Sequence, residues 1–153
     1  MYKRVPLLLV LIAGLGGVYF FAQPDTSTAL AAYRNAETVA TGKALYGEYC
    51  AACHGPDLAG EPDWQSRDAD GYLPAPPHDE TGHTWHHPTE QLFAITKLGT
   101  EAIVGGGYRS NMAGFGDLLT DDEIYAVLGY IKSTWTDRII ERHSQMDAAV
   151  LAQ

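Results

Sequence analysis

The chain has 153 residues, enough for one domain and an accessory segment, and 46% of them are hydrophobic and 19% charged. This composition indicates a globular protein and excludes a largely disordered one. The formal net charge of −9 argues against a nucleic-acid partner, because neutralising phosphates requires a basic surface.

An apolar run opens the chain. Lys3 and Arg4 precede the uncharged residues 5–22, which as a helix would measure about 27 Å, close to the thickness of a bilayer's hydrocarbon core. We predict that residues 1–22 form a retained signal-anchor, a single N-terminal transmembrane helix with its cationic end in the cytoplasm. The alternative is a cleavable signal peptide, which would leave a soluble periplasmic protein.

The segment after this run is acidic. Residues 23–35 are small and polar and are predicted to form a tether. All 19 carboxylates and eight of the ten Lys and Arg residues lie beyond residue 22, so that part of the chain has a net charge of −11. Such a surface would attract a partner that carries a basic patch.

Helical patterns follow in the rest of the chain. Residues 36–49 have helical spacing, with Gly42 suggesting a close helix crossing, and residues 89–98 end at Gly99. Thr120 begins a capping box, and residues 136–153 are predicted to be a continued or separate surface helix. The helix after Thr120 carries an apolar stripe of Ile124, Val127, Leu128, Ile131 and Trp135.

Cys50, Cys53 and His54 form the C-x-x-C-H pattern of covalent haem attachment. One helical turn can present both sulfurs to the porphyrin vinyl groups, and the histidine then reaches the iron. Other interpretations are a disulfide, a redox dithiol, or a zinc site completed by His83 and His87. The zinc interpretation leaves His54 unexplained and separates its two halves by about thirty residues, against the usual 12–15 or so.

Residues 60–88 contain five of the eight prolines and no periodic run. A loop of this length without regular structure is uncommon in a compact domain, but a haem can serve as the apolar core around which it wraps. We expect several apolar side chains to pack on the porphyrin: Trp64, Leu73, Trp85 and residues 74–77. The loop histidines, expected at the surface or near a haem propionate, also permit a weak zinc or copper site: His78, His83, His86 and His87.

Met112 is the favoured second axial ligand. Met1 begins the apolar run and Met146 lies in the polar tail, whereas Met112 stands among the glycines of residues 105–116. Those glycines let the backbone approach a flat cofactor, and a methionine ligand raises the reduction potential. A loop histidine in this position would instead make a bis-histidine haem of lower potential.

Four segments together resemble a class I c-type cytochrome of the monohaem, membrane-anchored bacterial kind: residues 42–46, 50–55, 112–115 and 119–131. The resemblance covers residues 36–135, which we expect to form the haem domain. It implies an all-α fold, with a few helices and long loops wrapped around one covalent haem c. It also implies that the first and last helices cross at Gly42, Tyr46, Val127 and Tyr130.

The same resemblance implies the site residues. Cys50 and Cys53 would form thioether bonds, His54 would be the proximal ligand, and Met112 the distal ligand. Pro62 is the expected acceptor for the ring N–H of the proximal histidine. Trp64 and Tyr108 are expected in the haem surroundings.

The function implied is one-electron transfer, with the iron cycling between Fe(II) and Fe(III), in a bacterial respiratory or photosynthetic chain. The protein would be a carrier and not an enzyme, anchored in the inner membrane with its haem domain in the periplasm. Its partners would be redox proteins, such as a respiratory membrane complex. The alternatives are a haem enzyme or gas sensor with a labile distal methionine, a cytochrome subunit of a larger oxidoreductase, and a histidine cluster that binds zinc or copper.

Overall fold

The computed structural model describes residues 30–153, and its regular elements are helical. The described residues form no named strand; Gly99 and Ala113 make an isolated antiparallel bridge. The predicted anchor lies outside the described residues, and among those described no helix is long and apolar enough to cross a membrane. In chain order the elements are η1 (Ala32–Arg34), α2 (Ala36–Tyr49), α3 (Ala51–His54), η2 (Thr84–His86), α4 (Thr89–Leu98), α5 (Thr100–Val104), α6 (Asp121–Ser133) and α7 (Asp137–Leu151).

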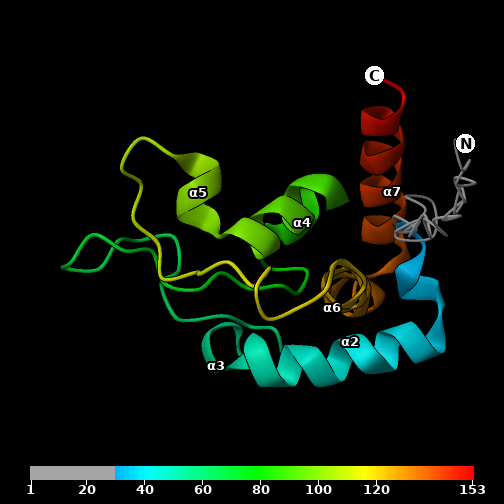
Figure 1. The fold of residues 1–153 in the computed structure, drawn as a ribbon, viewed down its shortest axis with the longest axis horizontal. Coiled ribbons are helices and arrows are strands. Elements are labelled where there is room, and N and C mark those ends of the chain that lie inside the picture. The colour runs from blue at the N-terminus through cyan, green and yellow to red at the C-terminus, as the bar shows by residue number, and fades with distance from the viewer. Residues whose placement is uncertain (1–29) are drawn as a thin grey trace, which may run out of the picture.

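The crossing of α2 and α6 forms the centre of the fold, with α4 on the other side of α6 (Figure 1). A Cβ added at Gly42 would collide with the carbonyl of Ala126 and lie 3.1 Å from Cβ of Tyr130. A glycine is therefore needed at this crossing, as the sequence predicted. Tyr46 and Val127 are each 2% exposed and belong to the core cluster beside the crossing.

Helix α6 begins at the predicted capping box. The Thr120 side chain accepts from the N–H of Glu123, and the Glu123 carboxylate accepts from the N–H of Thr120. This reciprocal pair satisfies donors that a helix start leaves open. The predicted apolar stripe is buried, and it contributes to two core clusters, one around Tyr46 and Trp135 and one around Leu119 and Ile124.

The end of the predicted tether is packed against the domain. Ala32, in η1, is 7% exposed, and a Cβ at Gly129 of α6 would lie 2.9 Å from the Ala32 Cβ. Asn35 then caps α2 by accepting from the N–H of Thr38. From residue 30 onward, the segment assigned to the tether is thus part of the folded domain, because small residues allow close contact with α6.

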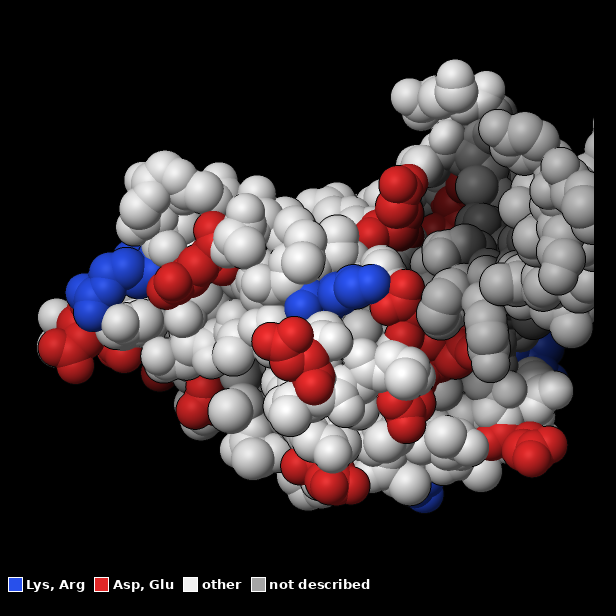
Figure 2. All heavy atoms as spheres, in the orientation of Figure 1, with Lys and Arg blue, Asp and Glu red and all other residues white. Residues whose placement is uncertain are grey.

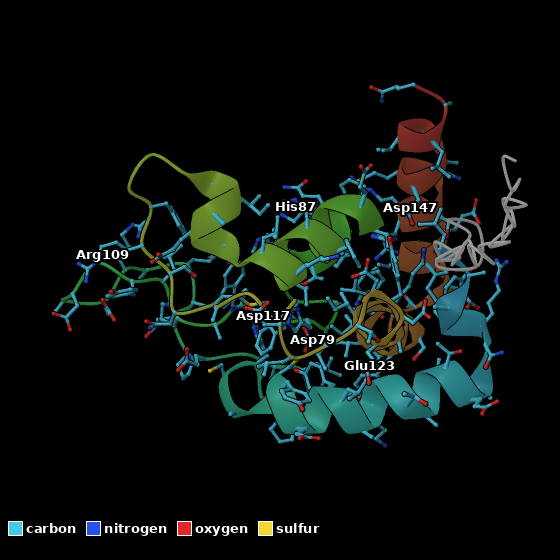
Figure 3. The ribbon with its side chains drawn as sticks, viewed as in Figure 1. Asp79, His87, Arg109, Asp117, Glu123 and Asp147 are labelled. Carbon is cyan, nitrogen blue, oxygen red and sulfur yellow. The ribbon has the colours of Figure 1, made fainter. Side chains whose placement is uncertain are left out.

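Helix α7 is more buried than the predicted surface helix. Its residues Ile139, His143 and Asp147 are each at most 4% exposed. Asp147 lies on the side of α7 that faces α4 (Figure 3), where its carboxylate accepts from the backbone N–H of Thr89 at 2.7 Å and from Lys132 Nζ at 3.2 Å. The predicted surface position is therefore wrong for this face of the helix, which buries a polar network.

The long loop contains only η2 as regular structure between residues 60 and 88, as its composition predicted. Specific contacts hold it against the helices. The indole N–H of Trp135 donates to the carbonyl of His78 at 2.8 Å, and the N–H of Thr136 donates to Glu80 Oε1 at 2.8 Å. The junction between α6 and α7 therefore fixes the loop.

Candidate haem site

The C-x-x-C-H residues lie where α2 ends and α3 begins. Cys50 is the C-cap of α2, and His54 occupies the last turn of α3 before Gly55, whose φ of 79° ends the helix. Tyr46 secures this turn, because its hydroxyl donates to the carbonyl of Gly55 at 2.9 Å. Both cysteines carry free thiols, so the disulfide interpretation is not supported.

One ring nitrogen of His54 makes a hydrogen bond to the protein. The residue is 6% exposed, and its Nδ1 lies 2.8 Å from the carbonyl oxygen of Pro76. A carbonyl can only accept, so Nδ1 carries the proton and Nε2 keeps its lone pair for a metal. This arrangement is typical of a metal-ligating histidine, whose second nitrogen donates to a fixed acceptor.

The acceptor predicted for this hydrogen bond, Pro62, is wrong. Pro62 and Pro76 both belong to the loop, but it is the segment leading into Pro77 that returns to α3. No local pattern distinguishes the carbonyl of Pro76 from that of Pro62, because the pairing depends on how the loop folds back onto α3.

Burial shapes the ionisation of the site. It lowers the pKa of His54, and the hydrogen bond to Pro76 only partly opposes this effect, so the neutral imidazole needed for ligation is favoured. Burial, followed by the charge of Cys53, raises the pKa of Cys50 to about 11. A redox dithiol normally depends on a lowered thiol pKa, which makes that interpretation of the motif a poor fit.

The zinc interpretation fails on geometry. Within residues 30–153, no group of three or more His, Cys, Asp or Glu side chains is placed to hold a metal ion. Cys50, Cys53, His83 and His87 all lie in this range, so the fold does not assemble them. The loop histidines, for the same reason, do not form a zinc or copper cluster.

The four loop histidines have different surroundings. The ring of His83 stacks on Trp64 at 5.1 Å between centroids, and that of His86 stacks on Trp85 at 3.7 Å. The carbonyl of His87 accepts from His143 Nε2 at 2.9 Å. Contact of Trp64 with a porphyrin stays a prediction, and Trp85 also donates its indole N–H to the carbonyl of Glu80.

His78 lies against His54. Its ring stacks face to face on that of His54, with centroids 4.0 Å apart and planes inclined by 26°. Two imidazoles on opposite faces of one iron have the metal between them and cannot stack in this way. His78 is therefore excluded as the distal ligand opposite His54.

Met112 stands in a loop whose backbone requires glycine. Gly105, Gly106 and Gly107 all have positive φ, from 61° to 78°, which other residues rarely adopt. Ser110 Oγ accepts from the N–H of Met112 at 3.1 Å, and the Met112 carbonyl accepts from the N–H of Thr100 at 3.3 Å. These bonds fix the backbone at Met112, and its ligation of iron stays a prediction.

Tyr108, also predicted near the haem, contacts a basic residue in the described structure. The guanidinium carbon of Arg67 lies 5.2 Å from the centroid of the Tyr108 ring. This cation–π contact joins the glycine-rich segment to the long loop. The position of Tyr108 relative to a haem stays a prediction.

These residues fit a covalently bound haem. Two free thiols lie one helical turn apart, and a buried histidine has its Nδ1 proton committed and its Nε2 lone pair available. A helical domain with this arrangement defines a haem-binding protein.

Comparison with known proteins agrees. The family model for cytochrome c matches residues 39–135, so the chain belongs to the cytochrome c family, and the match supports a class I c-type cytochrome. Membership implies covalently bound haem c and haem-based electron transfer.

One curated relative is a nitrite reductase from Stutzerimonas stutzeri, 33% identical over 135 residues. The aligned region covers 84% of this chain but 21% of the relative, so the chain spans about a fifth of that protein's length. No solved structure matches the chain.

Sequence reasoning did not identify several residues around His54. Pro76 accepts its hydrogen bond, His78 stacks on it, and Thr84 and Trp135 hold His78. The contacts of His78 with His54 and Trp135 join residues 24 and 57 positions apart, and no local pattern predicts them.

Proposed function

We propose that the chain is a one-electron carrier whose single haem c is attached through Cys50 and Cys53 and ligated by His54 and Met112. The observation that carries the proposal is the 2.8 Å contact between His54 Nδ1 and the carbonyl of Pro76. It supports His54 as an oriented ligand, because it places the ring proton on Nδ1 and leaves the lone pair of Nε2 available to bind iron.

Each residue has a separate role in this proposal. His54 binds the iron through Nε2, and Pro76 orients the imidazole. Met112 would be the second ligand of the iron and would keep small ligands from binding it. A haem held in this way supplies one-electron exchange between Fe(II) and Fe(III), and the remaining chain excludes water from its faces.

The methionine ligand is tested by Met112→His. The exchange should lower the midpoint potential and abolish the sulfur-to-iron absorption band, because imidazole favours the ferric state more than a thioether does. Met146→Leu, in α7, is the matched control and should retain both properties. An unchanged spectrum in Met112→His would remove Met112 from the proposal.

Covalent attachment is tested by denaturing the protein in acid acetone. We expect the colour to stay with the polypeptide, and to be lost from it in a Cys50→Ala, Cys53→Ala double variant. A colourless wild-type chain would overturn the proposal.

The reduced protein should not bind CO rapidly, because Met112 would occupy the site on the iron. Rapid CO binding would favour a sensor or enzyme with a labile methionine.

An acidic surface supports a partner with a basic docking face. Acidic side chains are spread over the face shown in Figure 2, where basic ones are few. Two lysines are already paired, Lys97 with Asp121 at 2.6 Å and the buried Lys132 with Asp147 at 3.2 Å. We therefore do not propose that this protein docks to its partners through its own lysines.

Small inorganic oxidants test the charge preference. The reduced protein should react with cationic tris(phenanthroline)cobalt(III) at a rate that falls as salt increases, and with anionic ferricyanide at a rate that rises. The opposite salt dependence would contradict an acidic docking face.

The apolar residues 5–22 support a location in the inner membrane, with the haem domain in the periplasm. Fractionation of cells producing the full chain tests this proposal. The protein should stay with the membrane after a high-salt wash, and release as a shortened soluble species would favour a cleaved signal.

The likeness to a nitrite reductase favours a second candidate, an electron-delivering cytochrome unit within or beside a larger oxidoreductase. Purification of the membrane-bound form, with identification of the proteins that co-purify, distinguishes the two. A free carrier should separate from other proteins, whereas a cytochrome unit should remain with an oxidoreductase. Turnover of nitrite by the chemically reduced, purified chain would contradict both and assign catalysis to the chain itself.

A further inference from the structure

His78 is fixed in place by contacts on three sides. Its ring Nδ1 lies 2.8 Å from Thr84 Oγ1, its backbone N–H donates to the carbonyl of Leu58 at 2.8 Å, and its carbonyl accepts from Trp135 Nε1 at 2.8 Å. Tyr46 approaches the ring edge-on, at 6.1 Å between centroids. The imidazole therefore has little freedom to rotate or shift.

The hydrogen bonds also determine its tautomer. The Thr84 hydroxyl donates to the carbonyl of Pro77 at 3.3 Å, and a hydroxyl has one proton to give. Both contacts of Thr84 are satisfied only if His78 Nδ1–H donates to Oγ1. Thr84 thus restrains the His78 ring in addition to the backbone contacts and the edge-on Tyr46 ring.

His54 also makes one hydrogen bond from its ring, from Nδ1 to the carbonyl of Pro76. This bond places Nδ1, but the torsion between a tetrahedral carbon and an imidazole has a broad energy minimum, so the ring can still tilt. The fixed ring of His78 lies against its face, at 4.0 Å between centroids and 26° between planes, and limits that tilt.

We propose that His78 is a positioning residue, which sets the plane of the His54 imidazole over the porphyrin and thereby the electronic structure of the ferric iron. This inference rests on the proposed ligation of iron by His54. The orientation of an axial imidazole decides which iron d orbital its π electrons meet, so a change of plane alters the magnetic spectrum even when both ligands remain bound.

The test uses His78→Leu, His78→Phe and Thr84→Val in the full-length haem protein, with His86→Leu as a control. His86 is an exposed histidine of the same loop whose ring stacks on Trp85. The measurements are the EPR g-values of the ferric protein, the proton NMR shifts of the haem methyl groups, and the midpoint potential.

We expect every variant to keep the optical spectrum of a six-coordinate haem. His78→Leu should shift and broaden the g-values and redistribute the methyl shifts, Thr84→Val should do the same to a smaller extent, and His86→Leu should match the wild type. His78→Phe retains a flat ring and should lie closer to the wild type than His78→Leu.

Wild-type g-values and methyl shifts in folded His78→Leu would overturn the inference. If that variant does not fold, wild-type spectra in Thr84→Val would overturn it instead. A phenylalanine variant no closer to the wild type than the leucine variant would exclude stacking as the cause. Loss of the proposed function itself is distinguishable, because His54 would then be absent from the wild-type iron coordination.

Discussion

The carboxylate of Asp147, near the end of the last helix, accepts two hydrogen bonds from Thr89 at the start of α4. The backbone N–H of Thr89 donates at 2.7 Å and its hydroxyl donates at 3.0 Å. Asp147 thus caps a helix that begins 58 residues earlier, since Pro88, at the N-cap position, makes no side-chain cap. The same carboxylate neutralises the buried Lys132 of α6, so one side chain joins α4, α6 and α7.

Asp147→Asn should lower the free energy of unfolding by about 3 kcal/mol, because it leaves the ammonium of Lys132 buried without an anion. The measurement is guanidinium denaturation at neutral pH, followed by circular dichroism. Glu141→Gln is the matched control on the same helix, as Glu141 is exposed and its bond is to Gln145. An equal effect of the two substitutions would show that the buried pair contributes nothing specific.

The pH dependence of stability should change in the same variant. Burial opposes ionisation of Asp147, but contacts with His143, the Thr89 N–H and Lys132 outweigh it and lower its pKa from 3.8 to about 2. A lowered carboxyl pKa stabilises the folded state above the unfolded pKa, and this contribution is lost as the pH falls towards 2. Between about pH 4 and 2 the wild type should therefore lose about 2 kcal/mol that Asp147→Asn does not lose.

Denaturant unfolding of the two proteins at a series of fixed pH values between about 4 and 2 gives the free energy of unfolding at each pH and so measures this difference. The curves of the wild type and Asp147→Asn should converge at the acid end. Curves that stay parallel throughout would contradict the lowered pKa of Asp147 in the folded protein.

Gly42→Ala should destabilise the protein by about 3 kcal/mol, because the new methyl group collides with the backbone carbonyl of Ala126 at the α2–α6 crossing. Gly47→Ala is the control in the same helix, where a Cβ would meet no atom within 4 Å. That variant should be neutral or stabilised by up to about 1 kcal/mol. Thermal unfolding of both proteins gives the comparison, and equal melting temperatures would argue against a close crossing.

Tyr46→Phe should cost about 1 kcal/mol of stability through loss of the hydrogen bond to the carbonyl of Gly55. The ring packing on Tyr130, at 5.4 Å between centroids, should remain. Tyr125→Phe is the control, since the Tyr125 ring stacks on Phe93 and its hydroxyl has no hydrogen bond in the described part of the chain. If the two variants have the same stability, the tyrosine hydroxyl does not support the turn after His54.

Much of the fold could be predicted from local patterns. The helices predicted over residues 36–49 and 89–98 have these bounds in the structure, Gly99 follows the second one, and the capping box at Thr120 is present. These features depend on helical periodicity, glycine conformation and caps, which are set by residues a few positions apart. The helix after Thr136 was also expected, but the burial of its His143 and Asp147 was not.

Buried polar residues explain that difference. Asp147 and His143 on this helix indicate an exposed face when they are judged from the sequence alone, because isolated charges are costly to bury. The cost is offset here by Lys132 and Thr89, which come from other helices. Their contribution cannot be read from the residues of α7.

The amino-acid sequence by itself determined the attachment motif, the acidic charge and the main helices, because each depends on the identity of a residue or on neighbours within a few helical turns. Only the tertiary structure decided that the Pro76 carbonyl accepts the hydrogen bond from His54, that His78 stacks on His54, and that Asp147 joins α7 to α4. These contacts join residues 22, 24 and 58 positions apart. Pairings at such separations depend on how the whole chain packs, and no local rule specifies them.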